Sequence, residues 1–211
     1  MFVAYIVRSL LMSDTSRFIW NSRRGPDRDH DGLVVWFTGL SGAGKTTLAR
    51  ALQQSLLERE LRVHVLDGDD VRKSFSSRLG FDLKSRSENV RRIGELAATF
   101  VDAGVIVLVA CISPMRADRD RIRSIHAPGS FLEIYVNAPL SVCEKRDPKG
   151  LYVGARANLI KDFTGISSPY EPPPHPDLEL HTDKLDVGAC VERLLLLIEE
   201  RLFKEPAEIH A

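Results

Sequence analysis

Hydrophobic positions along the chain follow two kinds of pattern. Residues 33–38 and 105–110 are apolar without the polar gaps of an amphipathic helix, which is typical of strands buried on both faces of a parallel sheet. Residues 87–103 instead place apolar side chains at helical spacing, and Gly104 follows as a natural helix stop. Strands that alternate with helices in this way predict parallel βαβ units.

The complete pattern predicts a three-layer α/β fold with a mostly parallel five-stranded sheet flanked by helices. The predicted strands are residues 33–38, 62–66, 105–110, 131–136 and, at an edge of the sheet, 178–181. The predicted helices are about 45–60, 71–77, 87–103, one that Pro114 opens, and 187–203.

The length and composition suit one globular domain with a sizeable core, because 44% of the 211 residues are hydrophobic and 27% are charged. Short segments are expected at both ends. The expected parts are an N-terminal arm (1–32, with 1–12 as a start-site extension if translation begins at Met12), the domain (33–204) and a C-terminal tail (205–211).

One segment inside the domain differs from its surroundings. Residues 147–176 are rich in proline and carry Lys149, Arg156 and Lys161. Such a stretch is typical of a lid built from short helical pieces. We expect it to close over a bound ligand.

Charge, hydrophobicity and cysteine content indicate where the protein is located and which partners it can bind. Lys plus Arg number 29 and so do Asp plus Glu, so the net charge of zero gives no basis for binding along nucleic acid. The apolar stretch at residues 2–12 is interrupted by Arg8 and is far shorter than the ~20 residues of a spanning helix. We expect a cytoplasmic protein without a membrane span. Its separated cysteines should be buried thiols: Cys111, Cys143 and Cys190.

The strongest motif lies at residues 39–46, which read GLSGAGKT and match GxxxxGK[ST] in full. It follows a predicted buried strand and precedes a predicted helix, as a phosphate loop must. Its glycines let backbone N–H groups converge on phosphate oxygens at the positive end of the helix. Lys45 is placed to reach the β- and γ-phosphates, and Thr46 to offer its hydroxyl to Mg²⁺. The fold is therefore expected to be of the P-loop NTPase type.

Other P-loop classes lack their signatures in this chain. There is no NKxD segment of a GTPase and no LSGGQ-like segment of a transporter ATPase. The third predicted strand ends in residues 111–114, which read CISP and contain no carboxylate of the kind that motor ATPases carry. The chain length and the candidate lid favour a small-molecule kinase.

Two polar segments are candidates for the rest of the site. Asp67 and Asp69 follow the second strand, where ligands of open α/β sheets bind, and a carboxylate there suits a base or a Mg²⁺ contact. The alternative for residues 67–70 is a solvated acidic turn or a helix N-cap without any chemical role. Arg86 and Asn89 are candidates for anion and nucleobase contacts. The alternative is a charged helix face on which Glu88 pairs with neighbouring arginines.

Taken together, these segments resemble the adenylylsulfate kinase family from about Val34 to Thr182. The pieces that carry the resemblance are residues 39–46 (GLSGAGKT), 67–72 (DGDDVR), 79–81 (LGF), 86–92 (RSENVRR), 112–114 (ISP), 116–119 (RADR), 146–152 (RDPKGLY) and 163–166 (FTGI), with 18–20 (FIW) in the arm. Apart from the phosphate loop each piece is weak, but their order and spacing are highly specific.

The resemblance implies that the chain transfers the γ-phosphate of ATP to adenosine 5′-phosphosulfate (APS) with Mg²⁺, by direct in-line transfer. Asp67 is then the base or a metal-shell group and Asp69 an APS contact, and the reverse assignment remains open. Lys149 is expected above the transferring phosphate, and Phe163 stacked on an adenine ring. The implied ATP contacts are Gly39, Ser41, Gly42, Ala43, Gly44, Lys45, Thr46 and Thr47, and the other implied APS contacts are Arg72, Phe81, Arg86, Asn89, Ile112 and Ser113.

Ser113 has a second possible role, because the family has been described with a phosphoserine at this position. No base stands near it in the sequence, so we expect a binding residue. The chain also departs from the family in two places. Asp70 stands where the family usually has Asn, and Val153 where it often has Lys. The first change weakens anion binding unless Asp70 points away from the site, and the second removes one lid cation but leaves Arg156 and Lys161.

Two other functions remain open at this point. Another small P-loop kinase, acting on a nucleotide or a sugar acid, would share the fold and the loop. A catalytically silent nucleotide-binding module would not need the intact Lys45, Thr46, Asp67 and Asp69. The resemblance also implies a homodimer and an association with ATP sulfurylase as candidate partners.

Overall fold

A computed structural model describes residues 32–202 of the chain. The expectations for the N-terminal arm, the start-site extension and the C-terminal tail lie outside these residues. Among the described residues, no helix is long and apolar enough to cross a membrane. All three cysteines are buried and free, as predicted.

The core of the fold is a five-stranded sheet in the order β2-β3-β1-β4-β5, in which every neighbouring pair is parallel. Residue Val35 of the central strand pairs with Leu108 on one side and Leu132 on the other. The predicted parallel sheet with its edge strand is confirmed. The strands are β1 (Leu33–Thr38), β2 (Val63–Asp67), β3 (Ile106–Ala110), β4 (Phe131–Asn137) and β5 (Leu178–His181).

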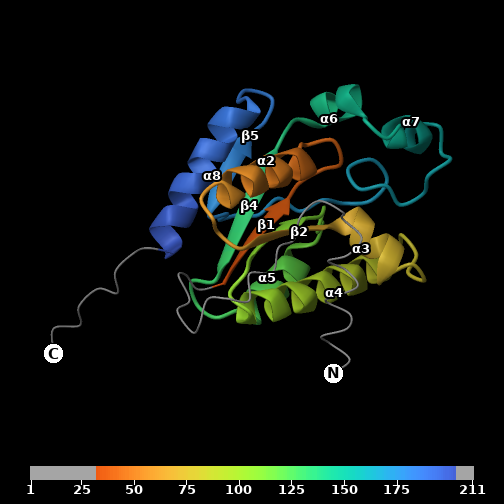
Figure 1. The fold of residues 1–211 in the computed structure, drawn as a ribbon. Coiled ribbons are helices and arrows are strands. Elements are labelled where there is room, and N and C mark those ends of the chain that lie inside the picture. The colour runs from red at the N-terminus through yellow and green to blue at the C-terminus, as the bar shows by residue number, and fades with distance from the viewer. Residues whose placement is uncertain (1–31, 203–211) are drawn as a thin grey trace, which may run out of the picture.

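Helices cover both faces of the sheet and complete the three layers (Figure 1). Helices α2 and α8 lie on one face, whereas α4 and α5 lie on the other. The helices are α2 (Lys45–Leu57), α3 (Gly68–Ser74), α4 (Leu83–Asp102), α5 (Arg116–Ser124), α6 (Leu140–Arg146), α7 (Leu151–Arg156) and α8 (Val187–Leu202).

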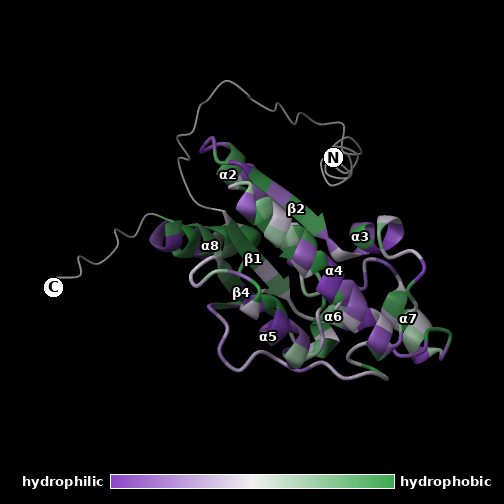
Figure 2. Cartoon of the chain, turned by 90° about the horizontal axis from the view of Figure 1, so that it is seen from below, coloured by the Kyte–Doolittle hydropathy of each residue, from purple (hydrophilic) through white to green (hydrophobic). Residues whose placement is uncertain are grey.

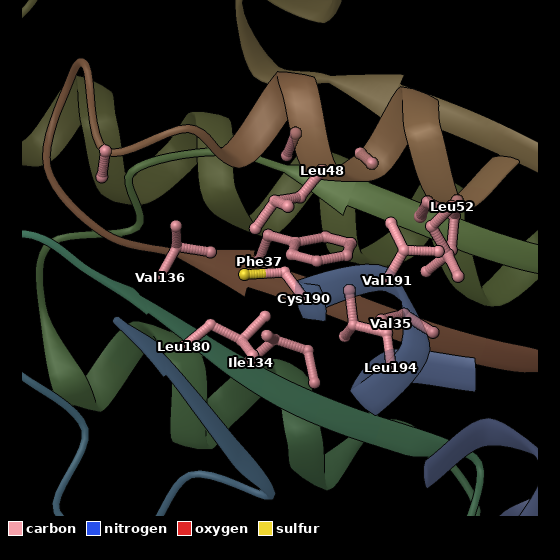
Figure 3. Close-up of a cluster of buried hydrophobic side chains, with 14 of the residues drawn as sticks. Val35, Phe37, Leu48, Leu52, Ile134, Val136, Leu180, Cys190, Val191 and Leu194 are labelled. Atoms are coloured by element: carbon pink, nitrogen blue, oxygen red, sulfur yellow. The ribbon is translucent and has the colours of Figure 1, made fainter. Parts of the chain in front are cut away.

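Strand β1 is apolar throughout because its side chains alternate between two hydrophobic clusters. Val35 and Phe37 pack with α2 and α8, in the cluster that Figure 3 shows around Leu48 and Leu194. Trp36 points to the other face, towards α4 and α5. In Figure 2 the central strands are green, whereas α5 is largely purple. The exposure of α5 to water accounts for most of this polarity, but Arg119 of this helix is buried.

Several element boundaries differ from the sequence prediction. Helix α4 begins at Leu83 rather than Ser87, because the Asp82 side chain caps it by accepting from Ser85 N–H at 3.0 Å. Helix α5 begins at Arg116 rather than at Pro114, since Met115 is extended. The short helix α6 was not predicted.

The arrangement of strands creates a site at the carboxyl ends of β1, β2 and β3. Successive strands lie on opposite sides of β1, because β3 and β4 are its two neighbours. The strand order therefore reverses at β1, and ligands of open α/β sheets bind at this switch point. The phosphate loop follows β1 directly.

Leu194 and Leu196 provide a matched test of the core, because they lie on the same helix with exposed fractions of 0% and 63%. Leu194→Ala should lower the free energy of unfolding by about 2–5 kcal/mol, since it removes buried methyl groups and leaves a cavity. Leu196→Ala should change it by less than about 0.5 kcal/mol. Urea unfolding followed by circular dichroism measures both. Equal losses would contradict the packing of α8 on the sheet.

Candidate active site

The phosphate loop has the conformation that its glycines predict. Gly39 has a φ of 148°, and a Cβ atom there would lie 2.3 Å from the carbonyl oxygen of Val136. Gly44 caps α2 with a φ of 104°. Both values fall in the region that favours glycine, so other residues would strain the loop. The backbone therefore curls tightly between β1 and α2.

Lys45 folds back onto this loop. Its ammonium donates to the carbonyls of Gly39 at 2.9 Å and Leu40 at 2.7 Å. Burial lowers the pKa of Lys45 to about 8, because the low-dielectric surroundings disfavour the charged amine. The nearby carboxylates of Asp67 and Asp69 act in the opposite direction. The amine is thus held in place and partly desolvated beside the loop.

Asp67 caps α3 and also bonds to the phosphate loop, whereas its role as a base or a Mg²⁺ contact stays a prediction. One carboxylate oxygen caps α3 by accepting from Asp69 N–H at 2.9 Å. The other oxygen accepts from the Thr46 hydroxyl at 2.7 Å. The cap orients the carboxylate, and the hydroxyl ties it to the phosphate loop. Two hard oxygens therefore lie side by side where the loop ends.

Asp69 forms an ion pair with Lys149, which comes from the candidate lid. This hydrogen bond is the main reason that the pKa of Lys149 is raised, although partial burial opposes it. Both side chains are more than half exposed, so the pair adds little stability. Its importance is geometric, since it joins the lid to the end of the sheet.

A cavity of about 940 Å³ connects these groups. It is lined by every predicted substrate contact and by most of the phosphate loop, whereas Gly39 and Ala43, which are buried, do not line it. The predicted residues that line it are Ser41, Gly42, Gly44, Lys45, Thr46, Thr47, Asp67, Asp69, Arg72, Phe81, Arg86, Asn89, Ile112, Ser113, Lys149 and Phe163.

Arg72 and Phe81 stand together at the mouth of the cavity. The Arg72 guanidinium lies 4.7 Å from the centre of the Phe81 ring and donates to the Gly80 carbonyl at 2.7 Å. The Phe81 side chain is 63% exposed, which is unusual for a large apolar residue. The ring therefore offers an open face to a ligand.

Arg86 links the start of α4 to the lid. Its guanidinium donates to the carbonyls of Phe81 and Asp162 and to the Thr164 hydroxyl. Phe163 lies between the last two partners and is 6% exposed. Arg86 thereby fixes the backbone on both sides of Phe163, a link across 76 residues that the sequence pattern did not reveal.

The Phe163 ring packs edge-on against Tyr152, with ring centres 4.9 Å apart. The Tyr152 hydroxyl in turn donates to the Ser41 carbonyl at 2.9 Å. Loop, α7 and lid are therefore joined at this wall of the cavity. One face of the aromatic ring is left to the cavity lining.

The first turns of helix α4 were predicted either to contact a ligand or to form a charged surface face, and the helix does both on different faces. Glu88 pairs with Arg91 at 2.7 Å and with Arg92 at 2.8 Å, as a charged helix face would. Asn89 lies on another face, lines the cavity and is only 6% exposed. Its Oδ1 atom has no hydrogen-bond partner within residues 32–202. A buried acceptor without a partner indicates a ligand that donates to it.

Ser113 is buried and its φ of 41° lies in the left-handed region. Its hydroxyl oxygen accepts from the Trp36 indole N–H at 3.1 Å. The side chain is therefore fixed by a donor rather than activated by a base. This geometry suits a binding residue, as the sequence predicted.

Arg146 and Thr182 also line the cavity but were not predicted as site residues. Arg146 donates to Thr182 O at 2.6 Å and to Gly42 O at 3.3 Å, and both Arg146 and Thr182 line the cavity. Arg146 precedes the predicted lid directly, but its proximity to the end of β5 depends on tertiary structure. These residues extend the site beyond the phosphate loop.

The two departures from the family pattern differ in position, because Asp70 lines the cavity near its exposed rim whereas Val153 does not line it. The Asp70 side chain is 64% exposed and pairs with Lys73 at 3.3 Å. Val153 is 71% exposed. The extra carboxylate is thus partly neutralised by its own helix.

Known proteins match the chain over most of its length. Residues 31–181 match the adenylylsulphate kinase family. The chain is 53% identical over 179 residues to an adenylyl-sulfate kinase of Prochlorococcus marinus, covering 84% of this chain and 89% of that protein. A Shewanella amazonensis adenylyl-sulfate kinase is 51% identical over 177 residues, and this match covers 84% of this chain and 89% of that protein.

Solved structures agree with the sequence comparison. A Mycobacterium tuberculosis APS kinase in complex with AMPPNP and APS superposes with a TM-score of 0.77 and 43% identity, covering 80% of this chain and 98% of that one. A Sinorhizobium meliloti gluconokinase (TM-score 0.51, 18% identity, 81% of this chain and 93% of that one) shares the fold alone. The family match and the relatives at about half identity show that this chain belongs to the adenylylsulphate kinase family.

Proposed function

We propose that the chain transfers the γ-phosphate of ATP to the ribose 3′-hydroxyl of APS and releases 3′-phospho-APS and ADP. The observation that carries the proposal is the single cavity that joins the phosphate loop to the aromatic, amide and arginine groups opposite it. The M. tuberculosis relative, whose structure contains AMPPNP and APS, supports the same pair of substrates.

ATP is assigned to the side of the phosphate loop. The backbone N–H groups of residues 41–46 and the start of α2 hold the phosphates, and Lys45 exchanges its carbonyl partners for phosphate oxygens. The base of ATP is assigned to the outer end of the cavity, where the planar Arg146 guanidinium offers a surface for stacking.

APS is assigned to the opposite wall. Its adenine lies against Phe163 and Phe81, and its exocyclic amine donates to the unpartnered Oδ1 of Asn89. Arg72 and Arg86 face the phosphosulfate with the guanidinium donors that the protein leaves unused. The adenine contact explains how a buried acceptor without a partner is tolerated.

Transfer needs an acceptor oxygen in line with the γ-phosphate and cations around the moving group. Asp67, held between Thr46 and the start of α3, accepts the proton of the ribose hydroxyl or orients it. Lys149 leaves Asp69 for the transferring phosphoryl group, and Asp69 is then available to APS. Ser113 contributes contacts and forms no phosphoenzyme, since no carboxylate or imidazole of residues 32–202 bonds to its hydroxyl as a base would.

Mg²⁺ fits the residues at the end of the loop. Thr46 Oγ1 and Asp67 Oδ2 lie 2.7 Å apart and are the hard oxygens that this ion prefers. Among residues 32–202, no group of three or more His, Cys, Asp or Glu side chains could hold a metal ion. Nucleotide phosphates and water would therefore supply the other ligands of Mg²⁺. When bound, Mg²⁺ neutralises charge on the phosphates.

The proposal also includes the oligomeric state, a partner protein and the cellular compartment. A homodimer and an ATP sulfurylase association follow from the family resemblance. A Thiobacillus denitrificans APS kinase, which superposes with a TM-score of 0.62 and 36% identity, is hexameric. The free thiols support a reducing cytoplasm, and the product suits sulfate assimilation.

The first test is acceptor choice. With MgATP, turnover should require APS, and the product should carry the new phosphate on the 3′-oxygen, as measured by ADP release and phosphorus NMR. AMP and gluconate should give no transfer, since the former lacks the sulfate and the latter the adenine. Transfer to either of these acceptors with none to APS would end the proposal.

The second test concerns Asp67. Asp67→Asn keeps a helix cap but removes the carboxylate, so kcat should fall roughly 10²–10⁴-fold, as for a lost acid–base group. Asp120→Asn is the matched control, because its exposed side chain pairs with Arg116 on the same helix and does not line the cavity, so kcat should be unchanged. An active Asp67→Asn enzyme would instead favour Asp69 as the base.

The third test uses the lowered pKa of Lys45, which is about 8. The free amine is charged at pH 7 and increasingly neutral above pH 8, and bound phosphates raise its pKa. ATP binding at about pH 9 should therefore take up a proton that is not taken up at pH 7. Calorimetry in buffers of different ionisation enthalpy measures this uptake. Lys45→Arg stays charged throughout, so the same uptake in this variant would contradict the assignment.

A further inference from the structure

An arginine of α5 lies in the interior of the protein. Arg119 is 2% exposed, and its Nε donates to Glu133 Oε1 at 2.7 Å. A buried ion pair is a weak source of stability, because desolvation of the two charges offsets their attraction. The purpose of this pair must therefore be sought in the geometry that it imposes.

The remaining Arg119 donors hold two segments that are distant in sequence. Nη1 donates to the Ser113 carbonyl and Nη2 to the Glu171 carbonyl, both at 2.7 Å. The guanidinium also faces the Tyr170 ring at 5.9 Å. One side chain thus joins the loop after β3 to the C-terminal part of the candidate lid.

Residues 112–114, which we call the acceptor loop, have all three carbonyls tied in this way. Each carbonyl accepts a hydrogen bond from a different part of the fold. The bonds are Ile112 O from Thr38 Oγ1 at 2.7 Å, Ser113 O from Arg119 Nη1 at 2.7 Å, and Pro114 O from Glu171 N–H at 2.8 Å.

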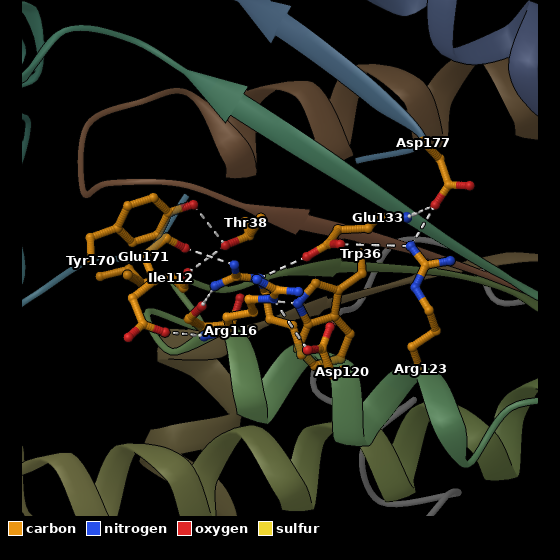
Figure 4. A network of polar contacts seen from close by, with 12 residues as sticks. Trp36, Thr38, Ile112, Arg116, Asp120, Arg123, Glu133, Tyr170, Glu171 and Asp177 are labelled. Carbon is orange, nitrogen blue, oxygen red and sulfur yellow. Dashed lines mark hydrogen bonds and ion pairs between the residues drawn. The ribbon is translucent and has the colours of Figure 1, made fainter. Parts of the chain in front are cut away.

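The network around the loop is shown in Figure 4, where Thr38, Tyr170 and Glu171 gather beside Ile112. Tyr170 and Thr38 share a hydrogen bond of 3.0 Å between their hydroxyls. The Glu171 carboxylate accepts from Arg116 N–H at 2.7 Å at the start of α5. Strand, helix and lid therefore meet at the acceptor loop.

Fixing the carbonyls has a consequence for the cavity. Ser113 is held at a φ of 41°, which is uncommon for a serine and needs support from its surroundings. The N–H groups of Ile112 and Ser113 make no hydrogen bond to any residue between 32 and 202, and both residues line the cavity. Two adjacent donors in such a turn suit an oxyanion.

We propose that Arg119 is a positioning residue for the acceptor substrate. Through the Ser113 and Glu171 carbonyls it holds the acceptor loop in register with the lid, so that the loop N–H groups meet an anionic group of APS. The inference rests on the proposed function and assigns to Arg119 no contact with the substrate. It explains why a charged pair is buried under the loop.

The test is the double variant Arg119→Met/Glu133→Gln, which removes both charges and leaves no unpaired anion. KM for APS should rise about tenfold or more, the effect of one lost charge-assisted hydrogen bond, while KM for ATP stays within about twofold. Arg121→Met is the matched control. Arg121 lies on the same helix, is 47% exposed and pairs with Asp118 at 3.1 Å, so both constants should be unchanged.

A spectroscopic readout separates positioning from general stability. Trp20 and Trp36 are the two tryptophans, and Trp20→Phe identifies the indole N–H resonance of Trp36. Because that N–H bonds to Ser113, the resonance should shift in the double variant and not in Arg121→Met. Thr38→Val, which removes no charge, should also raise KM for APS and shift the resonance, and it decides the question if the double variant does not fold.

An unchanged KM for APS together with an unchanged Trp36 resonance would overturn the proposal. A rise in KM for ATP equal to that for APS would also overturn it, since it would indicate a general loss of structure. If the wild type does not phosphorylate APS, the proposed function fails, whereas the indole resonance still decides whether Arg119 holds the acceptor loop.

Discussion

The site depends on the close approach of the phosphate loop to the end of β4. At Gly39 the backbone passes so near the Val136 carbonyl that a Cβ atom would lie 2.3 Å from it. This turn is possible only because β1 is fixed between β3 and β4, and it aims the loop at the switch point of the sheet. Strand β2 is separated from β1 by β3, but Asp67 at the end of β2 still accepts a hydrogen bond of 2.7 Å from Thr46.

The cations that line the cavity are also held in place by contacts within the protein. Lys45 is bound by two loop carbonyls, Lys149 by Asp69, and Arg146 by the end of β5. Each cation already has a partner of the opposite charge or dipole in the absence of a substrate. Phosphate binding therefore exchanges one partner for another and does not require the burial of an unpaired charge, which would be costly.

Sequence patterns predicted the elements that depend on local order. The apolar run of β1, the GLSGAGKT loop and the edge strand β5 are each determined by neighbouring residues, and all are confirmed. Helix starts were less accurate, because a cap such as Asp82 acts from outside the hydrophobic pattern. The family resemblance supplied the candidate residues of the cavity wall, whose roles remain predictions. What could not be predicted were links across long sequence distances, such as Arg86 to Asp162 and Arg146 to Thr182.

Arg119 shows why this limit is physical. Nothing in the polar pattern of α5 distinguishes it from Arg116, Arg121 or Arg123, which lie at or near the surface. Its burial follows from Glu133, a carboxylate in an otherwise apolar strand, and from the carbonyls of Ser113 and Glu171. A charged residue in a strand interior is thus the one local signal of the network. Because an apolar pair would fill the same space at no greater cost, the retained charge indicates a requirement for direction rather than for stability.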